Sequence, residues 1–93
     1  MRIAVLEIEL RAPWVHTLKE KRMVVRSLLA RLRNKFNISA CETAEQDVHQ
    51  TVVLGVAAVV ADAAQGDSIL DTVLSFVESA TEAQIVSVRR EFR

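Results

Sequence analysis

Three side chains of the 93-residue chain have the chemistry of soft metal ligands, or of a nucleophile and its base: His16, Cys41 and His49. Their spacing matches none of the paired patterns that hold zinc, so the sequence predicts no metal site. Cys41 and His49 become a nucleophile and base only if the fold brings them together, and a small buried thiol is the commoner role of a lone cysteine. The glycine-rich phosphate loops and the GxSxG elbow of hydrolases are absent. These observations favour a protein with no cofactor and no catalytic centre.

Glu7 and Glu9 form a pair of carboxylates on one face of an expected strand. Two carboxylates placed in this way can act as general acid and base. On an open antiparallel sheet beside Arg89 of the last strand, they act more often as cross-strand charge partners. We expect this structural role, and therefore a noncatalytic protein.

The strongest functional signal is cationic. Residues 16–36 carry seven Lys or Arg residues and one acid, Glu20. Cations along one helix can neutralise phosphates and release counterions, and an aromatic side chain in the preceding loop can stack on an unpaired base. The predicted RNA-binding residues are Trp14, His16, Lys19, Arg22, Arg26 and Arg33. The structural alternatives are a well-solvated helix whose last cations complement the dipole, a Trp14 that packs over a helix end, and a His16 that closes the turn.

The formal net charge of zero hides an asymmetry along the chain. Residues 1–36 hold nine Lys or Arg against three acids, whereas residues 37–93 hold three Arg against nine acids. In a compact domain this division produces either one basic and one acidic face or two sets of charges that interleave. Separate faces would favour a polyanionic partner or self-association.

The elements that position these residues follow from hydrophobic periodicity. Period-two patterns predict strands, and apolar residues at helical spacing predict helices, in the order strand, helix, strand, strand, helix, strand. The predicted strands are residues 2–12, 38–47, 51–61 and 83–93, and the predicted helices are residues 17–36 and 62–79. Thr17 and Glu20 form a capping box at the start of the first helix. Asn37 can adopt the left-handed conformation that closes it, and Gly66 weakens the first turn of the second.

The order of elements predicts one α+β domain over residues 1–93 with the ferredoxin-like βαββαβ sandwich. In that fold a four-stranded antiparallel sheet carries both helices on one face, and the first and third strands are central. The two most apolar predicted strands are the two that this topology places in the middle.

The other face of the sheet has no helix to cover it. The third strand presents apolar and small side chains there, which favours a homo-oligomer, most simply a dimer. The predicted interface residues are Val53, Ala57 and Val59, flanked by the charge partners Glu7 and Arg89. The same open face supports a second hypothesis for function, a dimeric sensor or adaptor that binds a protein or a small molecule.

Several segments of the chain are similar to a known family. HTLKEKR follows a first strand AVLEIEL, and RLRNKFNISACE, EQD, LGVA and VLSFVES come later. With them the chain resembles the YlxP-like bacterial proteins, a family of unknown function. The resemblance implies a ferredoxin-like fold, a bacterial cytoplasmic setting and genes often found among those for translation and ribosome maturation, with no established catalytic residues. Trp14, where a small residue is expected, and His49, where the family tends to have an aromatic, depart from the pattern.

Location and membrane association are predicted from three features. The amino terminus lacks the apolar run of a signal peptide, because Arg2, Glu7 and Glu9 interrupt it. The longest apolar run, residues 52–61, is about half the length of a membrane-spanning helix. The single cysteine fits a reducing compartment. We therefore expect a cytoplasmic protein with no membrane partner.

Overall fold

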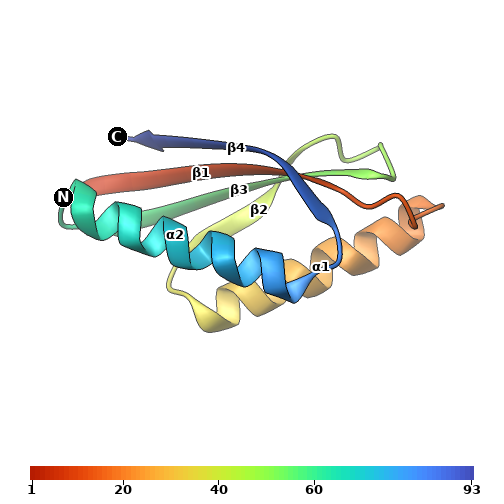
Figure 1. The fold of residues 1–93 in the computed structure, drawn as a ribbon, viewed down its shortest axis with the longest axis horizontal. Helices are drawn as coiled ribbons and strands as arrows, with labels where there is room; N and C mark the ends of the chain where they lie inside the picture. The colour runs from red at the N-terminus through yellow and green to blue at the C-terminus, as the bar shows by residue number, and fades with distance from the viewer.

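The computed structural model describes residues 1–93. The elements are β1 (Arg2–Arg11), α1 (Leu18–Lys35), β2 (Ser39–Ala44), β3 (Thr51–Val60), α2 (Ala63–Ala80) and β4 (Gln84–Phe92). The strands form one antiparallel sheet in the order β2-β3-β1-β4, and both helices lie on one of its faces (Figure 1). The predicted ferredoxin-like topology, with β1 and β3 in the centre, is confirmed. Neither helix is long and apolar enough to cross a membrane.

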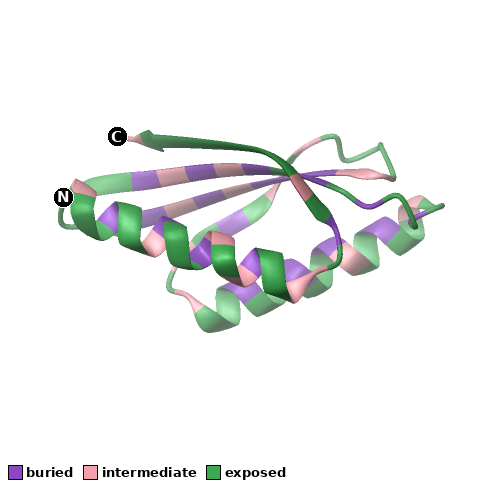
Figure 2. Cartoon of the chain, in the orientation of Figure 1, coloured by how far each residue is buried: buried purple, intermediate pink, exposed green.

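The core lies between the two central strands and the helices. Alternate residues of β1 from Ala4 to Leu10 are at most 1% exposed, and alternate residues of β3 from Val52 to Val60 are at most 3% exposed. Figure 2 shows this alternation along β1, whereas β4 is exposed over most of its length. The period-two pattern therefore defines a helix-facing surface and an open surface of the sheet.

Helix α1 begins where the capping box predicts. Thr17 is the N-cap, and its hydroxyl oxygen accepts a hydrogen bond of 3.1 Å from the backbone N–H of Glu20. The expected reciprocal bond to the backbone of Thr17 is not formed, because the Glu20 carboxylate accepts from the Thr17 hydroxyl instead, at 3.3 Å. The cap thus fixes the start of the helix and the direction of its cations.

The predicted role of Asn37 in closing α1 is wrong. Helix α1 ends at Lys35, Phe36 is the C-cap in extended conformation, and Glu45 is the only non-glycine residue with positive φ. The Phe36 ring packs edge-on against Phe76 of α2, with ring centroids 5.6 Å apart. The chain therefore leaves the helix in extended backbone and leads directly into β2.

Gly66 has a role in packing that its low helix propensity does not indicate. It is buried in the first turns of α2, on the stripe that continues with Leu70, Val73 and Val77. A Cβ atom at Gly66 would overlap the Phe92 ring and lie 3.3 Å from the Cβ of Ala4. Glycine at this position lets α2 approach β1 and β4 closely.

Replacing the N-cap tests the start of α1. Thr17→Ala is expected to lower the free energy of unfolding by about 0.5–2 kcal/mol, because the Glu20 N–H loses its acceptor. Urea denaturation followed by circular dichroism measures the change. Ser27→Ala, an exposed position within the same helix, is the matched control and should leave the stability nearly unchanged. Equal midpoints for the two variants would show that Thr17 does not cap the helix.

Candidate nucleic-acid interface

The seven cations of α1 divide into two groups. Four of them, Lys21, Arg31, Arg33 and Lys35, contact other parts of the chain. The remaining three, Lys19, Arg22 and Arg26, are exposed and form no ion pair or hydrogen bond within the molecule. We call these three residues the basic flank. Their charges are available to a ligand.

Lys21 is buried, unlike the other cations of the helix. Its side chain is 1% exposed, and its ammonium lies 2.8 Å from Oε2 of Glu42 on β2. The ammonium also donates to the carbonyl oxygen of Val48, at 2.6 Å, and to that of Glu45. A buried cation with three oxygen partners is a structural group. Lys21 is therefore not part of the basic flank.

The contacts of Lys21 hold the loop between β2 and β3 against the start of α1. A second residue of this connection, Gln50, donates from its side-chain amide to the carbonyl oxygens of Pro13 and Val15, each at 3.1 Å. The backbone N–H of Ala12 donates in turn to the carbonyl of Gln50, at 2.9 Å. The two loops thus lie together at the end of the molecule where α1 begins (Figure 1).

Arg33, a predicted RNA-binding residue, has a partner within the chain. Its guanidinium donates to the backbone carbonyl of Ala40 on β2. Arg33 therefore differs from the basic flank in having a hydrogen-bond acceptor within the chain. Arg22 and Arg26 precede Arg33 by eleven and seven residues. These separations are close to three and two full turns of an α-helix, so all three arginines lie on the same side of α1. The contact with Ala40 shows that this is the side next to the edge strand β2.

Arg31 and Lys35 stabilise the contact between the helices. The Arg31 guanidinium lies 5.5 Å from the centroid of the Phe76 ring and donates to the carbonyl oxygen of Ala80, at 2.8 Å. The Lys35 ammonium lies 5.0 Å from the centroid of the same ring. These cation–π contacts and the bond to the end of α2 account for both charges.

Trp14 and His16 lie at the start of α1 but are not equivalent. His16 is exposed immediately before the N-cap. Trp14 is 42% exposed and borders a hollow of about 380 Å³ between α1 and the end of α2. The hollow is lined by Trp14, Met23, Val24, Ser27, Leu28, Arg31, Ala80, Thr81 and Glu82. A nucleic acid that contacts both Trp14 and the basic flank must therefore cross the exposed surface of α1.

The open sheet face differs from the predicted interface at one position. Val53 is 6% exposed, so it has little surface for a partner even though its side chain points away from the helices. Val59 is 69% exposed and Ala57 is half-buried. Glu7 and Arg89 face each other in register, with 3.7 Å between their charged atoms. The predicted cross-strand charge pair is confirmed for Glu7. It is wrong for Glu9, which lies opposite Ser87 and forms no ion pair.

A shallow hollow of about 600 Å³ lies on this open face. The small side chains of Gly55 and Ala57 lie among its walls, and Arg33 and Arg93 supply its cations. Cys41 also borders it and is exposed. The expectation of a buried thiol is wrong, because Cys41 falls on the face of β2 that no helix covers.

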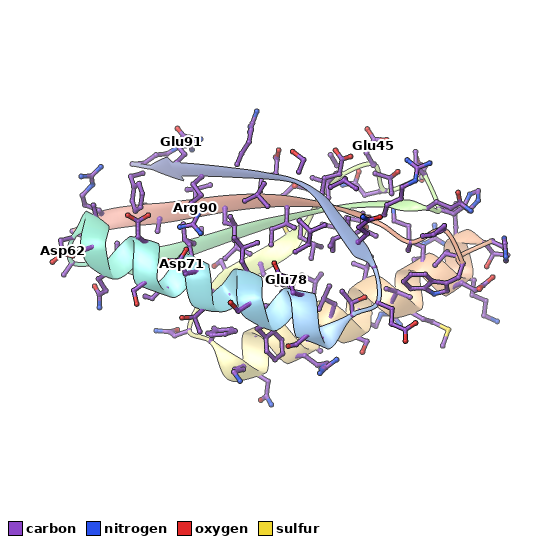
Figure 3. All side chains as sticks on the ribbon, viewed as in Figure 1. Glu45, Asp62, Asp71, Glu78, Arg90 and Glu91 are labelled. Atoms are coloured by element: carbon purple, nitrogen blue, oxygen red, sulfur yellow. The ribbon has the colours of Figure 1, made fainter.

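Part of the charge asymmetry along the sequence corresponds to a difference in charge between the two helices. Helix α1 carries the cations, whereas α2 contains three acids and no Lys or Arg. Arg90 of β4 reaches across to α2 and pairs with Asp67, at 3.4 Å, and with Asp71 (Figure 3). Glu91 points to the opposite side of the strand (Figure 3), where a hydrogen bond from Arg93, and then its charge, lowers the pKa of that carboxyl.

The fold and this charged surface define a small ferredoxin-like α+β domain with one cationic helix. The chain belongs to the family described as "Protein of unknown function (DUF503)", whose family model matches residues 3–90. It is 40% identical over 76 residues to the uncharacterized protein YlxP of Bacillus subtilis (strain 168), and the match covers 82% of this chain and 83% of that protein. The predicted YlxP-like membership is confirmed.

One solved structure with a similar fold is a de novo designed protein with ferredoxin fold, determined by solution NMR. The TM-score is 0.63 at 13% sequence identity, and the match covers 100% of this chain and 86% of that chain. At this identity the likeness concerns the fold alone.

Proposed function

We propose that this protein is a noncatalytic RNA-binding protein, with RNA of the ribosome as the candidate partner, and that it binds through the basic flank of α1. The observation that carries the proposal is the presence of three exposed cations without partners on one capped helix. Lys19 and Arg26 are seven residues apart, about 10 Å along the helix axis. Charges spread over this distance can contact successive phosphates of one strand.

Two further features support a polyanionic ligand. The positive end of the α1 dipole lies beside Lys19, at the same end of the helix as His16 and Trp14. The acidic helix α2 repels a polyanion, so a negatively charged ligand is directed towards α1 during encounter. The open sheet face carries no aromatic side chain for base stacking, so the helix and its preceding loop must provide the contacts.

The salt dependence of binding tests this proposal. Fluorescence anisotropy with a labelled single-stranded RNA and a labelled RNA hairpin gives affinities between about 50 and about 200 mM salt. If all three flank residues contact phosphates of a single strand, the slope of log K against log salt is about −2, since each contact contributes about −0.7. Arg22→Gln with Arg26→Gln should reduce the slope to about −0.7.

Charge reversal is the stronger test. Arg22→Glu with Arg26→Glu should abolish retention of the RNA at moderate salt. Arg2→Glu with Arg11→Glu, which reverses two exposed arginines of β1 outside the basic flank, is the matched control and should retain most of the affinity. Binding that is unchanged by the reversal on α1 would refute the proposed interface.

The hollow on the open face favours a second candidate function, a sensor or adaptor for a small molecule. Its cations, Arg33 and Arg93, favour an anionic group on the ligand. Ala57→Leu, which fills the hollow, separates the two candidates. RNA binding should tolerate this substitution. If the protein retains a small anion through purification, native mass spectrometry should detect the anion on the unsubstituted protein and not on the Ala57→Leu variant.

A further inference from the structure

Strand β4 forms a long unpaired edge of the sheet. It is the last strand in the order β2-β3-β1-β4, and no other ribbon lies beyond it in Figure 1. Its nine residues contain no Pro or Gly, and Val86 and Val88 are 48% and 39% exposed. An extended edge of this kind is a template for a further strand.

The hydrogen bonds to β1 show which backbone groups of β4 are free. Ile3 and Arg93 exchange both backbone bonds, at 2.8 and 2.9 Å. In an antiparallel ladder such pairs alternate with pairs that are not hydrogen-bonded, so Glu91 and Arg89 also direct their backbone groups towards β1. The backbone groups of Val88, Arg90 and Phe92 therefore point away from the sheet, towards the open edge.

We propose that two copies of this chain associate through antiparallel pairing of β4 with β4, about a twofold axis at Arg90. In this arrangement Arg90 pairs with its own counterpart, and Val88 pairs with Phe92 of the second copy. All of these residues have their backbone groups directed outward, so the hydrogen-bonding requirement is met without any change in the β1–β4 ladder. The two four-stranded sheets become one continuous sheet.

Charge complementarity selects this register. With the axis at Arg90, Arg89 of each copy lies opposite Glu91 of the other, in the closely spaced type of pair where side chains approach best. Axes at Arg89 and Glu91 are excluded, because the backbone groups of these residues point towards β1. An axis at Val88 has outward backbone groups, but it would place Arg89 opposite Ser87 and leave the arginine without a charge partner. Arg89 is available for the contact, because its own pair with Glu7 is long, at 3.7 Å, and exposed.

The side chains on the helix-facing side of β4 are also compatible with this register. Val88 is exposed in one copy and would cover Phe92 of the other, whose side chain is half-buried. The two Arg90 guanidiniums meet near the axis, but each is already paired with Asp67 and Asp71 of its own α2. Their mutual repulsion is therefore screened by carboxylates within each copy.

The mass in solution tests the proposal. Sedimentation equilibrium at micromolar to millimolar concentration should show a species of twice the 10.4 kDa chain mass. Val88→Pro removes one outward N–H and should yield a monomer, since proline is tolerated on a sheet edge that has no neighbour. Val88→Ala keeps the N–H and is the matched control, with the dimer retained.

A charge swap tests the register itself. Arg89→Glu should weaken the dimer, and adding Glu91→Arg in the same chain should restore it, because the opposed charges are then exchanged. Circular dichroism verifies that each variant is folded. A mass of one chain throughout the concentration range overturns the proposal. A dimer that resists Val88→Pro and Arg89→Glu but dissociates with Ala57→Arg also overturns it, and assigns the contact to the open sheet face.

Discussion

Replacing Lys21 with methionine is expected to lower the free energy of unfolding by about 3–5 kcal/mol, the typical cost of removing one partner of a buried ion pair. Methionine preserves the apolar stem but removes the ammonium. Glu42, which is 16% exposed, then lacks its counter-charge, and the carbonyl oxygens of Glu45 and Val48 lose a donor. The loop between β2 and β3 loses the contact that holds it to α1.

Urea denaturation measures this change, and Lys19→Met is the matched control. Lys19 is on the same helix and exposed, so its replacement should change stability by no more than about 0.5 kcal/mol. Lys21→Met combined with Glu42→Leu should recover part of the loss, because no unpaired charge is then left buried. A loss for Lys21→Met as small as that of the control would show that the ammonium is solvated.

Leu70→Ala is expected to cost about 2–5 kcal/mol, the range for a leucine truncated inside a packed core. Leu70 is 0% exposed and lies at the centre of the α2 stripe between Gly66 and Val73. Leu70 is enclosed between the helix and the sheet, so its truncation leaves a cavity in the core, and the cost increases with the volume of that cavity.

Thermal denaturation compares Leu70→Ala with Leu74→Ala. Leu74 lies one turn later in the same helix, but it is only partly buried against the core. Its truncation should therefore lower the melting temperature by clearly less. Equal shifts for the two variants would contradict the assignment of the buried stripe.

The elements and their order were predictable because each depends on local periodicity. The alternation in β1 and β3 and the capping box at Thr17 predict elements that the structure confirms to within a few residues. The role of Lys21 was missed, although a signal was present. Lys21 follows Leu18 by three residues and precedes Val25 by four, so it falls within the apolar stripe of α1.

The partners of the α1 cations could not be predicted from periodicity. Lys21 pairs with a carboxylate on β2 and with loop carbonyls, and Arg33 bonds to a backbone carbonyl of β2. These contacts depend on how the helix sits on the sheet, which is a tertiary property. A pattern of charges on a helix therefore overstates the binding surface until each cation has been matched with its partners.

The central position of β1 determines how the domain is completed during synthesis. β1 pairs with β3 along one edge and with β4 along the other. The hydrogen bonds of β1 are therefore complete only after β4, the last strand in the sequence, has been synthesised. While the chain is still being translated, β1 and β3 can pair as soon as residues 51–60 emerge. The second edge of β1 stays open until β4 follows, and during that interval it offers chaperones and neighbouring nascent chains a strand to bind.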